Sequence, residues 1–210
     1  MEKYISKKEK ASYGFAAVGR YMVAGISQSY LMYFFTDILI IPSAFVLMLM
    51  IVARAWDALN DPMMGVIVDR TSTKYGKMRP YVLIGSFLML VTTIVLFMPL
   101  TGAPTMFKMI FAAVSYIIFG MAYTLTDVPA MGLMSVATPN SDERASLLSF
   151  YVTVGSVGSL LPVGLLTIFR PFIPEKYVYF AMSIFVGIIT SAAYLTLFKN
   201  SKERFSTHTE

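Results

Sequence analysis

The sequence contains no cysteine and only one histidine, His208, which lies in the polar C-terminal end. The lack of cysteine excludes a disulfide framework, a thiolate metal site and a cysteine nucleophile. Charged residues are also scarce, at 14% of the chain, which is about half their share in soluble domains. The apolar stretches contain neither histidine nor cysteine and no recognisable nucleophile–base pair. We therefore expect neither an enzyme nor a bound cofactor.

Hydrophobic residues are abundant, at 57% of the chain, against roughly 45–50% in soluble domains. The charges fall in short clusters that separate long apolar runs, which is the layout of a polytopic helical membrane protein. The net charge of +5 does not indicate nucleic-acid binding, because the basic residues are not gathered with aromatics on one soluble face. The expected surroundings are a lipid bilayer.

Six segments are long enough to cross that bilayer, since a helix needs about 20 apolar residues to do so. We expect an all-α, polytopic membrane protein with six transmembrane helices. These predicted spans and the turn-like breaks between them form one bundle over residues 1–200, followed by a polar cytoplasmic tail at 201–210. The spans are predicted at about 12–36, 43–68, 80–100, 106–136, 146–170 and 177–198.

The distribution of basic residues predicts the orientation. If the N-terminus is cytoplasmic, twelve of the 17 Lys and Arg residues lie in inner segments and three, including Lys108, lie in outer ones. An excess of basic residues marks the cytoplasmic side, so both termini are expected there, in the plasma (inner) membrane. The remaining two, Arg20 and Arg54, fall within predicted spans.

One predicted span carries an unusual group of polar side chains in the stretch ARAWDALNDPMMG. A charge at bilayer depth costs about 2.5–3.5 kcal/mol, so such residues usually face a bundle interior or a watery cavity. At about 100° per residue, one helix face holds Arg54, Asp57, Asn60 and Asp61 together. The two carboxylates and the amide oxygen suit a small alkali cation, or the carboxylates can act as a pair of proton acceptors.

The fourth span repeats this arrangement in GMAYTLTDVPAMG, where Thr124 and Asp127 share a face. A hydroxyl and a carboxylate from this helix can complete an oxygen cage. Pro62 and Pro129 each leave one helical carbonyl without its N–H partner, and a free carbonyl can also face a cation.

A simpler explanation stays open for these polar residues. Arg54 with Asp57, and Arg20 with Asp127, can be structural ion pairs that fix helix packing. The small residues of the fifth span indicate close helix packing rather than a substrate site; they are Gly155, Gly158, Ser159 and Gly164.

Residues 53–86, ARAWDALNDPMMGVIVDRTSTKYGKMRPYVLIGS, resemble the signature region of the glycoside-pentoside-hexuronide cation symporters, a melibiose-permease-like branch of the major facilitator superfamily. Weaker similarity continues in SYGFAAVGRYM, YLMYFFTD and YTLTDVP. The resemblance implies a binding site for Na⁺ or H⁺, with Arg54 as a neighbour. Its ligands would be Asp57, Asn60, Asp61 and Thr124.

The family resemblance also implies a sugar site and a gating loop. For the sugar, Arg20 and Asp127 match the family's basic and acidic residues, but Tyr21 replaces an acid, Met131 a tryptophan and Val152 an arginine. The loop from 69 to 80 resembles the superfamily's cytoplasmic gating loop. The alternative is a basic loop that only fixes orientation, and both interpretations can hold together. The loop's residues of interest are Asp69, Arg70, Lys77 and Arg79.

Members of this family have about twelve helices in two six-helix bundles that rock about a central site. The chain resembles the N-terminal bundle only. We therefore expect a cation-coupled symporter of a sugar or glycoside that works with a missing C-terminal half or a second half-subunit. The alternatives are a half-length membrane protein without transport activity of its own and a related carrier for a less polar solute.

Overall fold

The computed structural model describes residues 4–205, so His208 and the second half of the predicted tail lie outside the described residues. Within them the chain forms six α-helices, one short π-helix and no strand, and the all-α prediction is confirmed. The elements are α1 (Lys7–Tyr33), η1 (Phe34–Ile38), α2 (Ser43–Arg70), α3 (Arg79–Leu96), α4 (Thr105–Val136), α5 (Ser141–Phe169) and α6 (Glu175–Asn200).

Two helices begin earlier than the apolar pattern predicted, because polar caps start them. Ser6 accepts a hydrogen bond from the backbone N–H of Glu9 at 3.1 Å, and α1 therefore begins at Lys7. Asn140 accepts from the backbone N–H groups of Asp142 and Glu143, and α5 begins at Ser141. The helices thus include polar first turns that a count of apolar residues leaves out.

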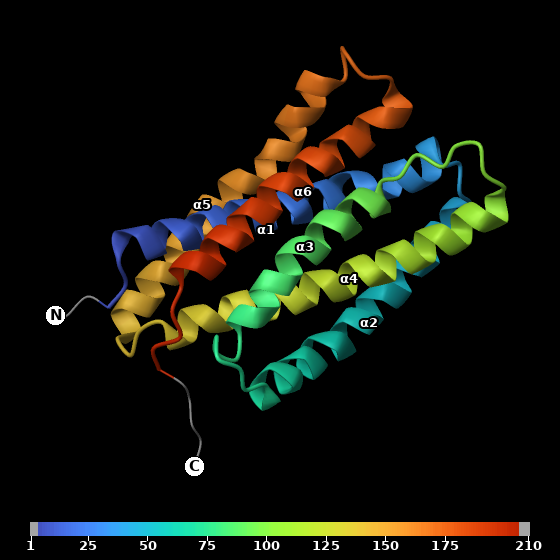
Figure 1. Cartoon of the computed structure of the whole chain (residues 1–210). Coiled ribbons are helices and arrows are strands. Elements are labelled where there is room, and N and C mark those ends of the chain that lie inside the picture. Colours follow the sequence, from blue (N-terminus) through green and yellow to red (C-terminus); the bar gives the residue numbers. More distant parts are fainter. Residues whose placement is uncertain (1–3, 206–210) are drawn as a thin grey trace.

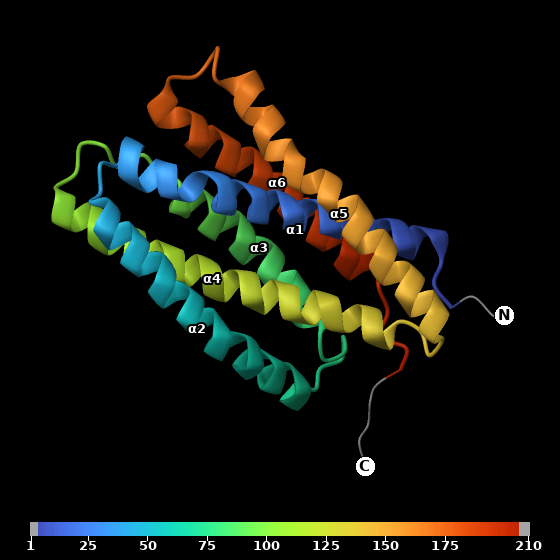
Figure 2. The same ribbon diagram turned by 180° about the vertical axis from the view of Figure 1, so that it is seen from behind.

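The helices run side by side, and the connections gather at the two ends of the bundle (Figures 1 and 2). The first and last described residues, 4 and 205, lie at one end of the bundle, beside the α2–α3 loop (71–78) and the α4–α5 turn (137–140). We call this the terminal end and the opposite one the far end. Helix α1 packs against α5 and α6, α3 packs against α4 and α6, and α2 packs on α4.

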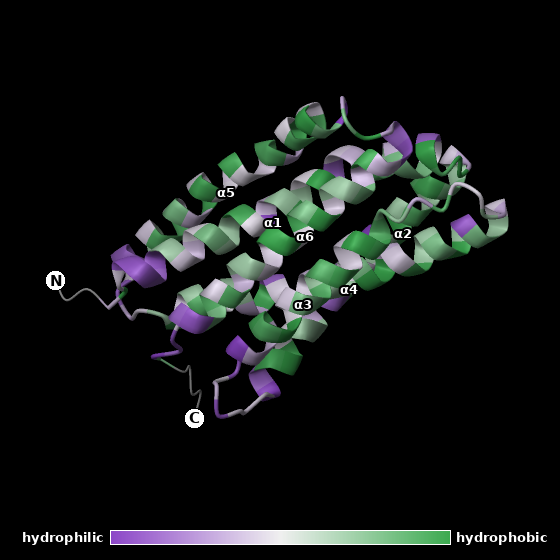
Figure 3. Cartoon of the chain, turned by 45° about the horizontal axis from the view of Figure 1, so that its top comes forward, coloured by the Kyte–Doolittle hydropathy of each residue, from purple (hydrophilic) through white to green (hydrophobic). Residues whose placement is uncertain are grey.

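Hydrophobic residues dominate the helices, and hydrophilic residues gather at the loops and helix ends (Figure 3). In the described chain, five helices are long and apolar enough to cross a membrane, namely α2 to α6. Helix α1 is not among them, since it carries Arg20, Gln28 and several serines. The sixth crossing therefore stays a prediction.

The small residues of α5 mostly serve packing, as expected. A Cβ on Gly158 would lie 2.7 Å from the Val18 carbonyl oxygen of α1, and one on Gly25 would lie 2.9 Å from the Ser159 carbonyl oxygen. Close approach of α1 and α5 therefore requires these glycines. Gly164 has open space around it, so it takes no part in this packing.

Candidate functional site

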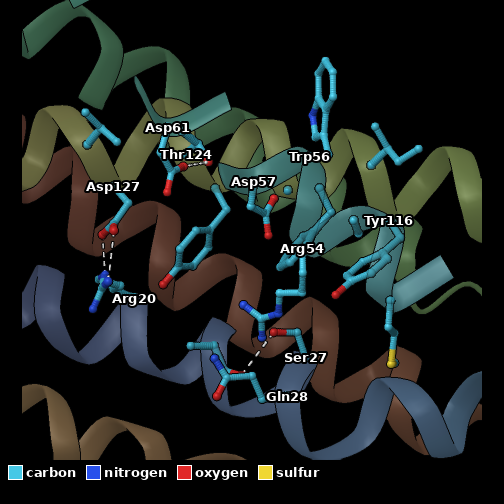
Figure 4. A pocket seen from close by; sticks show the side chains of 18 residues that line it. Arg20, Ser27, Gln28, Arg54, Trp56, Asp57, Asp61, Tyr116, Thr124 and Asp127 are labelled. Atoms are coloured by element: carbon cyan, nitrogen blue, oxygen red, sulfur yellow. Dashed lines mark hydrogen bonds and ion pairs between the residues drawn. The ribbon is translucent and has the colours of Figure 1, made fainter. Parts of the chain in front are cut away.

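A cavity of about 560 Å³ lies between α1, α2 and α4. The five charged residues that the sequence analysis placed at bilayer depth all line it: Arg20, Arg54, Asp57, Asp61 and Asp127. Figure 4 shows these side chains converging from the three helices. The cost of burying charge in a bilayer is reduced because the charges share one polar cavity.

Both aspartates of α2 are directed towards α4. The hydroxyl of Thr124 donates a hydrogen bond to Asp61 Oδ1 at 2.8 Å. The Asp57 carboxylate lies one helical turn away against Gly120, where a Cβ would come within 3.2 Å of Asp57 Oδ1. Two carboxylates and a hydroxyl thus line one wall, and these hard oxygen donors suit an alkali cation.

Asn60, the fourth predicted cation ligand, is not among the residues that line the cavity. Its Nδ2 is buried and has no hydrogen-bond partner in the described part of the chain. The structure therefore brings together three of the four predicted ligands. A cation role for Asn60 stays a prediction.

Arg20 and Asp127 form an ion pair across the cavity, in which Nε and Nη2 of the guanidinium both donate to the carboxylate. The Nη2–Oδ2 distance is 3.0 Å, and the two side chains keep 21% and 17% of their exposure. The rings of Tyr21 and Tyr123 lie 5.1 and 5.9 Å from the guanidinium carbon. One of the two ion pairs considered from the sequence therefore exists.

The other pair is absent, because Arg54 makes no ion pair or hydrogen bond within residues 4–205. In Figure 4 its side chain extends from α2 towards Ser27 and Gln28 of α1. Both of these residues line the cavity, as does Tyr116 of α4, and the sequence interpretation had missed all three. Ser27 follows Arg20 by seven residues, which returns it to the same helix face, so helical periodicity was a usable signal.

Tyr21, the third predicted substrate residue, does not line the cavity. Its ring lies against Gly155 of α5, where a Cβ would come within 2.5 Å of Tyr21 Cδ2. The observed role of Tyr21 is to pack α1 on α5 and to lie beside Arg20. Its contact with substrate stays a prediction.

The predicted gating loop lies at the terminal end (Figure 1), and none of its four residues of interest lines the cavity. The backbone N–H groups of Lys77 and Arg79 donate to the Glu203 carboxylate after α6, at 2.8 and 2.9 Å. The Arg79 guanidinium donates to the Phe198 carbonyl oxygen at 2.7 Å. Asp69 and Arg70 are exposed at the end of α2.

Comparison with known proteins defines the class. Residues 12–210 match the family described as MFS/sugar transport protein. The chain therefore belongs to this family, and the resemblance drawn from residues 53–86 is confirmed. It is an integral membrane protein.

Among its curated relatives is the uncharacterized symporter YjmB of Bacillus subtilis, which is 34% identical over 97% of this chain and 45% of that protein. The putative glycoside/cation symporter YagG of Escherichia coli is 30% identical over 96% of this chain and 44% of its own length. The isoprimeverose transporter of Lactiplantibacillus pentosus is 28% identical over 95% of this chain and 42% of its own length. The chain thus spans about half the length of the curated relatives it matches.

Proposed function

We propose that the chain forms the N-terminal half of a symporter that couples entry of Na⁺ or H⁺ to uptake of a sugar or glycoside. The observation that carries this proposal is that one cavity holds both a pair of acidic residues and a separate Arg–Asp pair. Asp57, Asp61 and Thr124 supply oxygen ligands for the cation, with Asn60 as a fourth candidate. Arg20 and Asp127 form the polar centre of the solute site.

The two sites are joined through α4. Thr124 and Asp127 are three residues apart and share a helix face, so α4 contributes one side chain to each site. A cation bound by Asp61 and Thr124 acts on the backbone segment that also holds Asp127. Such coupling between two sites is typically worth about 1–3 kcal/mol.

The chemistry of the solute side suits hydroxylated ligands. An Arg–Asp pair offers donors and acceptors in a fixed plane, which matches the paired hydroxyls of a sugar ring. Ser27, Gln28 and Tyr116 add neutral hydrogen-bonding groups to the same cavity. The names of relatives, an isoprimeverose transporter and a putative glycoside/cation symporter, support the same class of solute.

The topology and the partner are part of this proposal. We place six spans in the inner membrane with both termini cytoplasmic, which puts the loop containing Asp69, Arg70, Lys77 and Arg79 on the cytoplasmic side. Alternating access then requires a second six-helix half that closes the open side of the cavity.

The experiment is uptake of labelled glycosides by the complete carrier, driven by a sodium or proton gradient. Asp61→Asn is expected to abolish cation-driven uptake, because it removes one charge from the cation site. Asp142→Asn is the matched control, since Asp142 is exposed in the first turn of α5 and lies outside the cavity. Cation-driven uptake that survives Asp61→Asn would refute the proposed cation site.

A further inference from the structure

Helix α2, which carries Asp57 and Asp61, buries few of its side chains against the rest of the bundle. Five of its 28 residues are buried, namely Val46, Leu49, Ala53, Met64 and Val68. It packs mainly on α4, and Figure 1 shows it on the outside of the bundle. Its terminal end leads directly into the α2–α3 loop.

That loop is bound by one carboxylate from a distant part of the chain. Glu203 Oε2 accepts from the Lys77 N–H at 2.8 Å, and Oε1 accepts from the Met78 and Arg79 N–H groups, both at 2.9 Å. The N–H groups of Met78 and Arg79 are among the donors at the start of α3 that no helical carbonyl can satisfy, and a negative charge there is favourable. Gly76 has a φ of 105° and lies so close to Glu203 that any side chain would collide with the carboxylate.

The segment that carries Glu203 is itself anchored to other helices. We call residues 201–205 the strap. Arg204 forms a two-point ion pair with Glu9 of α1, at 2.9 and 2.7 Å, and Glu9 is 1% exposed. The backbone N–H groups of Arg204 and Phe205 donate to the Val136 carbonyl oxygen at the end of α4, at 3.3 and 3.1 Å. Through the strap, the α2–α3 loop is joined to α1 and α4.

We propose that Glu203 is a positioning residue that sets where α2, and with it Asp57 and Asp61, lies relative to α1 and α4. The geometry joins the helix of the acidic pair to the two helices that carry Arg20 and Asp127. The consequence for transport rests on the proposed function. The claim about the position of α2 does not rest on the proposed function. An experiment can therefore refute either claim without refuting the other.

The fluorescence of a native tryptophan, Trp56, reports the position of α2. Trp56 is the only tryptophan in the sequence, it lies on α2 one residue from Asp57, and it is 37% exposed. Its emission maximum and its quenching by acrylamide report the surroundings of α2. Hydrogen exchange at Lys77, Met78 and Arg79 reports the loop contact itself.

Both quantities are measured on the purified chain in phospholipid nanodiscs. Glu203→Ala is expected to speed exchange at these three amides by about tenfold or more, because each amide loses a hydrogen bond to a charged acceptor. It is also expected to shift the Trp56 emission maximum. Glu203→Gln keeps one strong acceptor oxygen and should give a smaller change in amide exchange and in Trp56 emission. This variant also keeps the test possible if Glu203→Ala does not fold.

Glu143→Ala is the matched control. The Glu143 carboxylate also lies at the terminal end, where it accepts from the Ile5 N–H at 3.1 Å and the Thr138 hydroxyl at 2.7 Å, but it does not bind the α2–α3 loop. It should leave both readouts unchanged. The proposal would be overturned if Glu203→Ala left amide exchange unchanged, or if it sped exchange without changing Trp56 emission. It would also be overturned if Glu143→Ala had an equal effect.

Discussion

The Thr124 hydroxyl donates a hydrogen bond to Asp61 Oδ1 at 2.8 Å, which ties α4 to α2 at the level of the cavity. Thr124 is 5% exposed, so water does not compete strongly for this bond. Within residues 4–205, Asp57 has no such partner and instead lies against Gly120. The two aspartates of α2 are therefore unequal, and Asp61 is the one that α4 holds in place.

This bond predicts different effects of two substitutions at Thr124. Thr124→Val keeps the shape but removes the hydroxyl, which should raise the cation concentration for half-maximal uptake by about tenfold, since a hydrogen bond to a charged group is worth about 1.5–3 kcal/mol. Thr124→Ser should stay close to the wild type. Uptake measured against Na⁺ concentration and pH tests this, and equal curves for Val and Ser would contradict it.

Arg20 and Asp127 provide a test that separates solute binding from helix packing. Arg20→Gln leaves Asp127 without its partner and should destabilise the fold, by less than the roughly 3–5 kcal/mol of a fully buried pair, because the two side chains keep 21% and 17% of their exposure. The double variant Arg20→Gln with Asp127→Asn should recover most of that stability, because neither charge remains. Thermal unfolding in detergent measures this recovery.

Solute binding should not recover in the same double variant, because the charged donors and acceptors are gone. Equilibrium binding of a labelled glycoside provides this second measurement. A double variant that regains both stability and binding would show that the pair only packs helices.

Glu9 and Arg204 predict a stability difference between the two ends of the bundle. Arg204→Met leaves the Glu9 carboxylate buried and unpaired, so it should lower the free energy of unfolding by about 3–5 kcal/mol. Arg170→Met breaks the Arg170–Glu175 pair, whose side chains are 63% and 45% exposed, and should cost less than about 1 kcal/mol. Similar unfolding temperatures for the two variants would refute the assignment of Glu9–Arg204 as a structural anchor.

Two glycines of α5 should respond to alanine in opposite ways. Gly158→Ala places a methyl group against the backbone of Val18 and should push α1 and α5 apart, with a loss of about 1–3 kcal/mol. Gly164→Ala meets nothing within 4 Å and should be neutral or stabilising by up to about 1 kcal/mol, because alanine favours helix. Thermal unfolding of the two variants checks this, and equal losses would contradict the packing role of Gly158.

The helices and the grouping of charges followed from the sequence because both depend on local spacing. Asp57 and Asp61 share a face through helical periodicity alone, and the cost of burying them predicted a polar cavity. Periodicity does not give the rotation of one helix against another. Arg20 and Tyr21 point about 100° apart on α1. Only the packing of the helices decides that Arg20 faces the cavity and that Tyr21 packs on α5.

Contacts between distant segments were not predictable in this way. Glu203 and the α2–α3 loop are more than a hundred residues apart, and no short pattern links a polar tail to a helix start. Lys108 was counted as an outer basic residue, but it is 6% exposed and donates to the Leu39 carbonyl oxygen at 2.9 Å. That contact lies beside the turn after η1, where Ile40 adopts a φ of 56°.

The most direct test of the account is the affinity of the complete carrier for a labelled glycoside while Na⁺ concentration and pH are varied. In the wild type, one of the two cations should raise the affinity about fivefold or more, the usual range for coupled sites. In the double variant Asp57→Asn with Asp61→Asn, the affinity should no longer depend on either cation. A cation site at Asp57 and Asp61 would be contradicted if the wild-type affinity changed with neither cation. It would also be contradicted if the affinity of the double variant changed with the cations as much as that of the wild type.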